Sequence, residues 1–510
     1  MGNLCTHNNK NKTVAVIGGG ISGISAATTL IKNGYNVVIF EKTNSLTGVW
    51  KSKVNDSSTL QVDSCIFSQV DTEAISIGNN TNNVYSTAEE VVEYYEKYIR
   101  DNNLSNNVKF NCDVLEYINN IDGSVDIIYE ENKIKKQETF YSVWIRTGSL
   151  GKRSEITYNG EDKFLGNIAY GDSNDTKEIN FTNKHVTVIG AGAFANDNVI
   201  NAINSGAKSV TMLVRNRRFI FPRKEIAAMG YQGLSIMNAL SNSSRIKNWQ
   251  KIMESCKEKY IEAGLLNHYN QLTKKVDGYD IQSWSGVGNA SDEMFLAAKY
   301  NILDIVDGEI EELNEDSIIT KDDRIIKTDI IVKCIGSKSN DQLLKGKLLV
   351  DTIFDFHSNG KVNHNVNIDH TTKPFFLGPL VNPNVFVLIA YPLISNIFDS
   401  VCVKAMENPK SLKRAWRRSL SGPNYEFSTI ETVDISSYLT LFWKILDLKY
   451  PFAWIPSLAN VFWTARRKLY NYLDQDFYKK LDDDWNKLDE KYKLLQIKYN
   501  GIEETKKSDI

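Results

Sequence analysis

Two glycine-rich turns constrain the fold of this chain more than any other feature. The first, GGGISG, occupies residues 18–23, and the second, GAGAFA, occupies residues 190–195. Each turn follows a short β-type run, VAVI at 14–17 and VTVI at 186–189, and leads into a pattern typical of a helix. Strand, glycine turn and helix in this order are typical of a dinucleotide-binding unit. The chain is therefore predicted to hold two dinucleotides at once.

The residue types in each turn match what a bound pyrophosphate requires. The first glycine permits a tight bend, and the second lets the backbone approach the phosphates because it has no Cβ atom. The third position, glycine or alanine, packs the helix against the strand while the helix N-terminus faces the phosphates. The residues expected in these roles are Gly18, Gly20 and Gly23 in the first turn and Gly190, Gly192 and Ala195 in the second.

The ends of the next strands predict which dinucleotide each unit binds. The strand after the first turn ends at Glu41, whose carboxylate suits the unphosphorylated ribose of FAD or NAD. The strand after the second turn ends at Arg215, followed by Arg217 and Arg218, and a cation there suits the 2′-phosphate of NADPH. A basic cluster after a strand is as often a solvated face, so the roles of Arg217 and Arg218 stay open.

Composition favours an organic cofactor as the source of the chemistry. The six cysteines form no CxxC pair and the six histidines form no HExxH motif, so neither a redox-active disulfide nor a metal site is expected. A net charge of −2 with scattered basic residues does not indicate a surface that binds nucleic acid. No run of 18 apolar residues occurs, so no membrane-spanning helix is expected, and the widely spaced cysteines favour the cytoplasm.

The first residues fit a lipidation pattern. The sequence MGNLCT fits N-myristoylation at Gly2, and Cys5 is placed to take a palmitoyl chain. One myristoyl chain binds a membrane only weakly, so the second chain matters for anchoring at a cytosolic membrane face. A chance match in a polar leader is the alternative.

The pattern along the chain predicts an α/β protein with two nested Rossmann-like domains and a helical C-terminal extension. The packing of this extension on the body is favoured, and capping of a dimer or of the active site and docking on a bilayer are the alternatives. The expected segments are a flexible leader (1–12), an FAD-binding domain in two parts (13–183 and 329–434), an NADPH-binding domain with a helical insertion (184–328) and the aromatic extension (435–510).

These motifs resemble those of the flavin-containing monooxygenases over about residues 13–400. Besides the glycine turns, residues 47–50 (TGVW) are similar to the family's GGxW, residues 147–148 to its ATG, residues 164–170 to its FxGxxxH and residues 329–336 to its strand ending in ATG. The resemblance implies one FAD and one NADPH. The residues expected at these cofactors are Gly18, Gly20, Gly23, Glu41, Gly48, Trp50, Val114, Thr147, Gly148, Gly190, Gly192, Ala195, Arg215, Arg217 and Gly336.

The resemblance also implies a reaction. NADPH would reduce FAD by hydride transfer, molecular oxygen would add at flavin C4a, and one oxygen atom would pass to a small nitrogen or sulfur nucleophile. Retained NADP⁺ would exclude water from the hydroperoxyflavin. Two alternatives stay open: an NADPH oxidase or diaphorase that releases peroxide, and a non-catalytic peripheral membrane protein that senses NADPH.

Two departures from the family pattern give the candidate catalytic residues. Tyr170 replaces a connecting histidine and is followed by Gly171 and Asp172, which disfavours Baeyer–Villiger chemistry. Asp63 stands about where the family has its active-site asparagine, and a carboxylate there would change how the oxygenated flavin is held. The alternatives are that Asp63 is a surface turn residue and that Trp50 is a core aromatic rather than a neighbour of the flavin.

Overall fold

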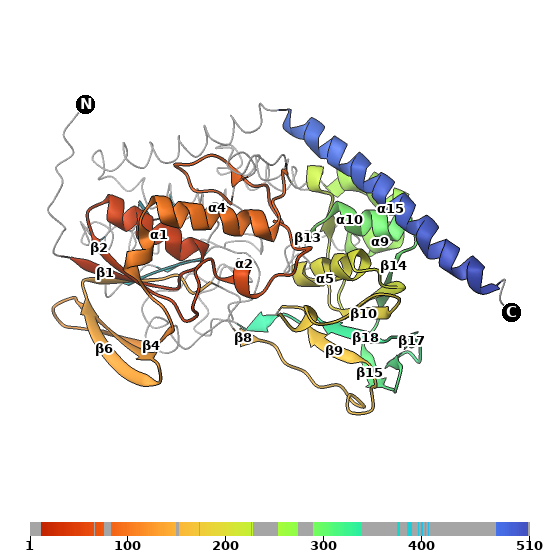
Figure 1. Ribbon diagram of the computed structural model, residues 1–510, viewed down its shortest axis with the longest axis horizontal. Helices are drawn as coiled ribbons and strands as arrows, with labels where there is room; N and C mark the ends of the chain where they lie inside the picture. Colours follow the sequence, from red (N-terminus) through yellow and green to blue (C-terminus); the bar gives the residue numbers. More distant parts are fainter. Residues whose placement is uncertain are drawn as a thin grey trace, which may run out of the picture.

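The computed structural model shows an α/β protein with two parallel sheets in separate units, which confirms the predicted fold class (Figure 1). Gly2, Cys5 and the whole segment from 435 to 475 lie outside the residues that the structure describes. The described residues are 12–65, 67–75, 83–148, 152–172, 174–225, 227, 253–273, 289–338, 375–377, 385–389, 396, 399, 400, 403, 406 and 476–507.

The first sheet has the strand order β20-β21-β7-β1-β2-β3, with β1 between parallel neighbours. Helix α1 (Ile21–Lys32) connects β1 to β2. Helix α4 (Ala88–Asp101) begins at a capping box, in which Thr87 and Glu90 each satisfy a backbone amide of the other. The strands are β1 (Thr13–Ile17), β2 (Asn36–Phe40), β3 (Val108–Lys109), β7 (Ser142–Ile145), β20 (Phe375–Leu377) and β21 (Val385–Ile389).

Strand β1 is buried on both faces because its side chains alternate between two cores. Val14 and Val16 pack with α1 and α4, whereas Ala15 and Ile17 face a small antiparallel sheet. That sheet packs against Phe40 and includes Val114, whose side chain is buried. Its strands are β4 (Cys112–Asn119), β5 (Val125–Glu131) and β6 (Ile134–Phe140).

The second sheet has the order β14-β11-β10-β18-β9, and all its neighbouring strands are parallel. Its central strand β10 packs on one side with α5 and α10. The elements are β9 (Asn167–Tyr170), β10 (His185–Ile189), α5 (Ala193–Asn204), β11 (Ser209–Val214), α10 (Asp292–Lys299), β14 (Leu303–Asp307) and β18 (Ile330–Lys333).

One prediction about this region is wrong. We expected the chain to rejoin the first domain at residue 329, but β18 pairs with β10 and β9 in the second sheet. Among the described residues, the first sheet resumes at β20 and β21, where β21 pairs with β7. A short, fully buried apolar run suits a central strand of either sheet, so its sequence does not say which sheet it joins.

Shorter elements complete the second unit. Strands β15 to β17 form an antiparallel sheet against the face of the second sheet that α5 does not cover, and β12 pairs with β13. The bounds are β12 (Ile220–Phe221), α9 (Leu266–Thr273), β13 (Asn289–Ala290), β15 (Ile310–Leu313), β16 (Ser317–Thr320) and β17 (Ile325–Lys327).

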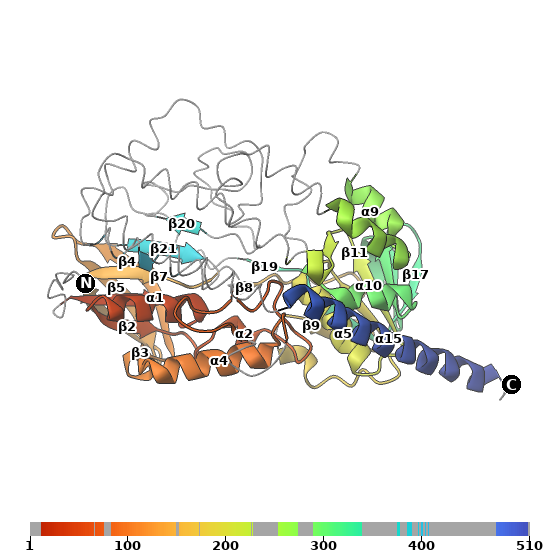
Figure 2. The ribbon, with the colours of Figure 1, turned by 90° about the horizontal axis from the view of Figure 1, so that it is seen from above.

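Two strands connect the units. The chain leaves the first sheet after β7 through β8 (Lys152–Arg153) and returns from the second sheet through β19 (Ser337–Lys338). These two strands pair with each other in antiparallel fashion. Figure 2 shows them between the two sheets.

The last helix, α15 (Phe477–Lys507), lies along the second unit (Figures 1 and 2). Tyr492 is fully buried in the core that includes α10, and Lys299 of α10 pairs with Asp489 at 2.7 Å. These contacts support packing as the role of this part of the extension. Among the described residues, no helix combines the length and apolar character needed to cross a membrane.

Candidate cofactor and active site

The first turn is held by close backbone contacts that only glycine allows. Gly18 has φ of +102°, and a Cβ atom there would lie 2.5 Å from the carbonyl oxygen of Arg146. A Cβ atom at Gly23 would lie 1.9 Å from the carbonyl oxygen of Gly18. Both positions therefore require glycine for reasons internal to the fold.

The middle glycine of the first turn is different. Gly20 has φ of −69°, which any residue adopts, and the nearest described atom to a Cβ there is the Gly48 Cα at 3.9 Å. Gly20 is also the N-cap residue of α1, where backbone amides and the helix dipole favour an anion. The described protein atoms leave this space open, and a pyrophosphate fits it in charge and position.

The second turn repeats this arrangement. Gly190 has φ of +123°, and a Cβ atom there would lie 2.3 Å from the carbonyl oxygen of Cys334. Ala195 is fully buried between helix and strand. Gly192 is the N-cap residue of α5, has φ of −87°, and no described atom lies within 4 Å of a Cβ built there. A second pyrophosphate fits at this position.

Glu41 is buried beside the first turn. Its Oε2 accepts a hydrogen bond from the Gly19 amide at 2.7 Å, and its Oε1 accepts from the amide and hydroxyl of Thr43 at 2.8 Å each. A carboxylate has about four acceptor positions, so one remains for a ribose hydroxyl. The role of Glu41 at the ribose stays a prediction, and its anchoring by Thr43 was not visible in the sequence pattern.

The TGVW segment packs directly on the first turn. Thr47 pairs with Gly20 in an isolated bridge, and a Cβ atom at Gly48, with φ of +60°, would lie 3.1 Å from the Gly20 Cα. Trp50 is half-buried and meets Phe67 edge to face, with 5.4 Å between the ring centres. That contact supports the alternative role of Trp50 as a core aromatic.

A buried ion pair lies behind the first turn, and the sequence analysis missed it. Arg146 occupies the alanine position of the ATG-like motif, and its Nη2 lies 2.7 Å from Oδ1 of Asp399, with both side chains fully buried. Burial raises the pKa of Asp399 to about 6, against the effect of Arg146 and of a hydrogen bond from Ser25 of α1. The chain thus places a charged pair beside the helix that begins at the first turn.

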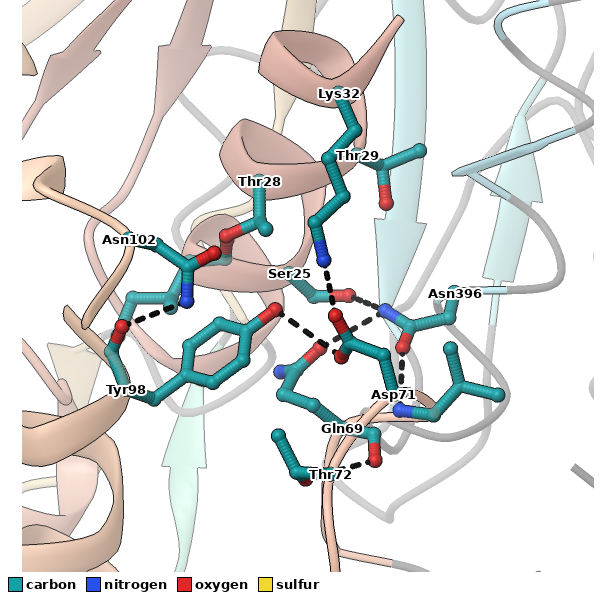
Figure 3. A network of polar contacts seen from close by, with 12 residues as sticks. Ser25, Thr28, Thr29, Lys32, Gln69, Asp71, Thr72, Tyr98, Asn102 and Asn396 are labelled. Carbon is teal, nitrogen blue, oxygen red and sulfur yellow. Dashed lines mark hydrogen bonds and ion pairs between the residues drawn. The ribbon is translucent and has the colours of Figure 1, made fainter.

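Asn396 extends this polar contact to the loop before α4. Its Nδ2 donates to the hydroxyl of Ser25 and, at 3.0 Å, to Oε1 of Gln69, while its Oδ1 accepts from the Val70 amide at 2.8 Å. Figure 3 shows Ser25, Gln69 and Asn396 pointing toward one another. Asp71 of the same loop pairs with Lys32 at the end of α1. The loop is therefore fixed to α1 by several side chains.

Asp63 lies in this same loop region and is buried, with 1% of its surface exposed. Its Oδ1 accepts a hydrogen bond from the Cys65 amide at 3.0 Å. The alternative that Asp63 is a surface turn residue is wrong, because its side chain is buried. Its catalytic role stays a prediction.

Tyr170, the other candidate, lies at the end of β9 in the second sheet. Its ring packs under the guanidinium of Arg153, 4.3 Å from the ring centre, and its hydroxyl contacts the backbone of Ile156. The structure thus places Asp63 in the first unit and Tyr170 beside the connection between the units. The two do not share an element, and a role for Tyr170 at the flavin stays a prediction.

The basic residues after β11 differ from one another. Arg217 is held by Asp307, whose Oδ1 accepts from Nε at 2.6 Å and whose second oxygen pairs with Nη2. Arg215 is exposed directly after the strand. Arg215 is therefore the better candidate for the 2′-phosphate, because Arg217 would have to share its guanidinium with Asp307.

The remaining predicted cofactor residues lie at the ends of strands near the connection between the two units, or in the core. Thr147 and Gly148 are exposed directly after β7, and Gly336, with φ of +87°, precedes β19. The side chain of Val114 is buried in the core, and a role for Val114 at the cofactor stays a prediction. In the part of the chain that the structure describes, no group of three or more His, Cys, Asp or Glu residues is placed to hold a metal.

The segment after TGVW joins the two units, and we call residues 53–61 the docking segment. Asp197 of α5 lies beside Ser58, and burial raises the pKa of Asp197 to about 7. Further side-chain contacts of the docking segment with the second unit are Lys53 with Asp172 (3.5 Å), Ser57 with Asn204 (3.1 Å), Thr59 with Arg223 (2.8 Å) and Gln61 with Ala290 (2.7 Å).

Comparison with known proteins identifies the family. The family model described as flavin-binding monooxygenase-like matches residues 11–347. Flavin-containing monooxygenase 5 of Homo sapiens is 26% identical over 49% of this chain and 48% of its own length. A 4-hydroxybenzoate brominase (decarboxylating) of Pseudoalteromonas luteoviolacea is 24% identical over 64% of this chain and 62% of its own. The chain thus spans about half to three fifths of these relatives.

A solved structure has the same fold. A crystal structure of OTEMO in complex with FAD and NADP superposes with a TM-score of 0.53 at 14% identity, over 80% of this chain and 90% of that one. Because the family model covers more than half of the chain, the chain belongs to the flavin-binding monooxygenase-like family. The family predicted from the sequence motifs is confirmed.

The open space at the two middle glycines gives a paired prediction. We expect Gly20→Val to fold but to purify without FAD, because a branched side chain would occupy the place of the pyrophosphate. Gly192→Val is the matched control and should keep its FAD while losing reduction by NADPH. Flavin absorbance per mole of protein measures the first effect. A Gly20→Val protein with a full complement of FAD would contradict this assignment.

The 2′-phosphate site can be tested with the two arginines after β11. We expect Arg215→Ala to weaken NADPH binding by about 1.5 to 3 kcal/mol, as for a charge-assisted hydrogen bond, and to leave NADH binding unchanged. Arg217→Ala should have the smaller effect, since Asp307 already engages that side chain. Titration with each nucleotide measures both. Equal losses for NADPH and NADH would reject the assignment of Arg215.

The raised pKa of Asp197 predicts a pH-dependent stability. Its neutral form is favoured in the folded protein, so its contribution is fully present below its ordinary pKa of 3.8 and is lost as pH rises through about 7. We expect Asp197→Asn to match the wild type at pH 4 and to gain about 1 to 2 kcal/mol at pH 8, since water reaches part of the side chain. Thermal unfolding midpoints across this range measure the gain. A gain that is constant with pH would exclude Asp197 as its source.

Proposed function

We propose that this member of the flavin-binding monooxygenase-like family is an FAD-dependent, NADPH-consuming monooxygenase that oxygenates a soft nitrogen or sulfur nucleophile through a C4a-hydroperoxyflavin. The observation that supports this most is the repeated turn, in which Gly20 and Gly192 each leave space at a helix N-terminus for a pyrophosphate. The solved relative that holds FAD and NADP in the same fold supports the pairing of cofactors.

The chain's own residues bind and orient the two cofactors. FAD would be held at the first turn, with the amides at the start of α1 at its phosphates and Glu41 at its ribose. NADPH lies at the second turn, with Arg215 at its 2′-phosphate. When bound, the flavin supplies the redox chemistry and the activation of oxygen.

The docking segment lies between the two cofactor turns and contributes to the exclusion of water. It runs from the end of α2 (Val49–Ser52) to the residues just before Asp63, and its side chains bond to the second unit along its length. A closed interface of this kind strengthens polar interactions within the site and limits the loss of activated oxygen to water.

The carboxylate of Asp63 supports a second candidate function, an NADPH oxidase that releases peroxide. A carboxylate at this position, in place of the family's asparagine, can hold or relay a proton, whereas an amide cannot. A proton delivered near the activated oxygen speeds the departure of peroxide. The balance between oxygen transfer and peroxide release therefore depends on whether residue 63 carries a carboxylate or an amide.

The ratio of peroxide released to NADPH consumed distinguishes the two functions. A monooxygenase should show a ratio well below one when a small amine or thioether is present, and reduced flavin mixed with oxygen should pass through an absorbing intermediate. We expect Asp63→Asn to lengthen the lifetime of that intermediate by removing the proton donor. Asp56→Asn makes the same chemical change at an exposed position and serves as the control. A ratio near one under every condition, with no intermediate, would leave only the oxidase.

Attachment to a membrane surface through acyl chains on Gly2 and Cys5 also belongs to the proposal, on the sequence motif alone. One chain binds weakly and two bind stably. In a eukaryotic host, Gly2→Ala should move the protein to the soluble fraction, and a variant that stays on the membrane would refute acylation as the anchor.

A further inference from the structure

Arg223, which lies just after β12 in the second unit, makes three contacts with the first unit. Its Nη2 donates to the hydroxyl of Thr59 at 2.8 Å, and its guanidinium lies 5.1 Å from the ring centre of Tyr85. Its carbonyl oxygen accepts from the Tyr85 hydroxyl at 2.5 Å. Thr59 itself pairs with Thr87 in an isolated bridge, so the two partners of Arg223 lie on adjoining segments.

On its own side, Arg223 is fixed by the start of α10. Its backbone amide donates to Oδ1 of Asp292 at 2.8 Å, and Asp292 is buried at the first position of that helix. The side chain of Ser291 caps the same helix by accepting from the Met294 amide. The backbone of Arg223 is thus held by the second unit, while its guanidinium donates a hydrogen bond to the first unit.

The strands around Arg223 also lead to the second glycine turn. Strand β12 pairs with β13, in which Asn289 donates from Nδ2 to the carbonyl oxygen of Ala191 at 2.6 Å. The next residue, Ala290, donates its amide to Oε1 of Gln61 at 2.7 Å. Strand β13 therefore contacts the second glycine turn through Asn289 and the docking segment through Ala290.

The contacts join the first unit, which holds the flavin in the proposed function, to the second glycine turn. In the first unit they reach the end of the docking segment, which leads directly to Asp63. The second glycine turn is the one that holds the pyrophosphate of NADPH in the proposed function. A continuous path runs between them: Thr59 accepts a hydrogen bond from Arg223, Arg223 follows β12 in the chain, β12 pairs with β13, and Asn289 of β13 donates to Ala191.

We propose that Arg223 is a positioning residue for the reduction of the flavin by NADPH. In that step NADPH loses a hydride and becomes NADP⁺, and the flavin gains the hydride with its two electrons. Arg223 gains and loses no proton. It fixes the distance between the two units, and a misplacement of about 1 Å between reacting groups costs on the order of 10²-fold in rate. This inference rests on the proposed function.

Anaerobic reduction of the bound flavin by NADPH, followed by rapid mixing, tests the role of Arg223. We expect Arg223→Met to slow the limiting rate of reduction by 10-fold or more, while FAD content and the Kd for NADPH stay within threefold of the wild type. Arg223→Lys should recover part of the rate, because a cation can still lie over the Tyr85 ring. Tyr85→Phe keeps the ring and removes only the bond to the Arg223 carbonyl, so its effect should be smaller.

The neighbouring Lys224 gives the matched control. It is exposed and pairs with Asp482 of α15 at 2.7 Å, so Lys224→Met removes a charge of the same sign without touching the first unit. We expect it to reduce at the wild-type rate. The double variant Arg223→Met, Thr59→Val should be no slower than Arg223→Met alone, since both changes remove the same bond.

The outcomes separate the inference from the function on which it rests. Wild-type flavin that dithionite reduces but NADPH does not would overturn both. A wild-type protein reduced by NADPH, with Arg223→Met reduced at the same rate, would overturn the role of Arg223 alone. Loss of rate matched by an equal loss of NADPH affinity would likewise overturn positioning, because it would show that Arg223 acts on binding.

Discussion

In both units a carbonyl oxygen from the neighbouring strand presses against the first glycine of the turn, and the rest of the structure depends on this contact. Arg146 supplies the oxygen just after β7, and Cys334 supplies it just after β18. The contact fixes how far the turn stands from the sheet, and so where the following helix begins. The middle glycine of each turn then faces the space that a phosphate needs.

In the first unit, a buried ion pair lies next to this contact. Removing the Arg146 and Asp399 side chains from water has a large cost, which a well-formed pair and the hydrogen bond from Ser25 offset in part. Asn396 then connects Ser25 to the loop that follows Asp63. The position of the candidate catalytic carboxylate and the position of the cofactor helix are thus linked through one buried polar network.

The sequence predicted the two turns because their chemistry is local: glycine types, flanking strands and helix starts all lie within a few residues of one another. It did not predict which sheet takes the strand at 330–333, because an apolar run carries no information on its partner. The sequence left open whether Asp63 is an active-site or a surface turn residue, and it missed the pairing of Arg217 with Asp307, for the same reason. Each depends on contacts between residues that the turn and strand patterns do not relate, as does the contact of Arg223 with Thr59.

The paired connection of β8 and β19 means that the segment between them enters and leaves the second unit at one place, and α15 packs on that unit later in the chain. An insertion with adjoining ends leaves the host sheet intact whether it is present or not. In the proposed function, exchange of the module between these two neighbouring points would change the electron donor without rebuilding the sheet of the first unit. What limits the exchange is the docking segment, whose hydrogen-bonding groups any incoming module must match.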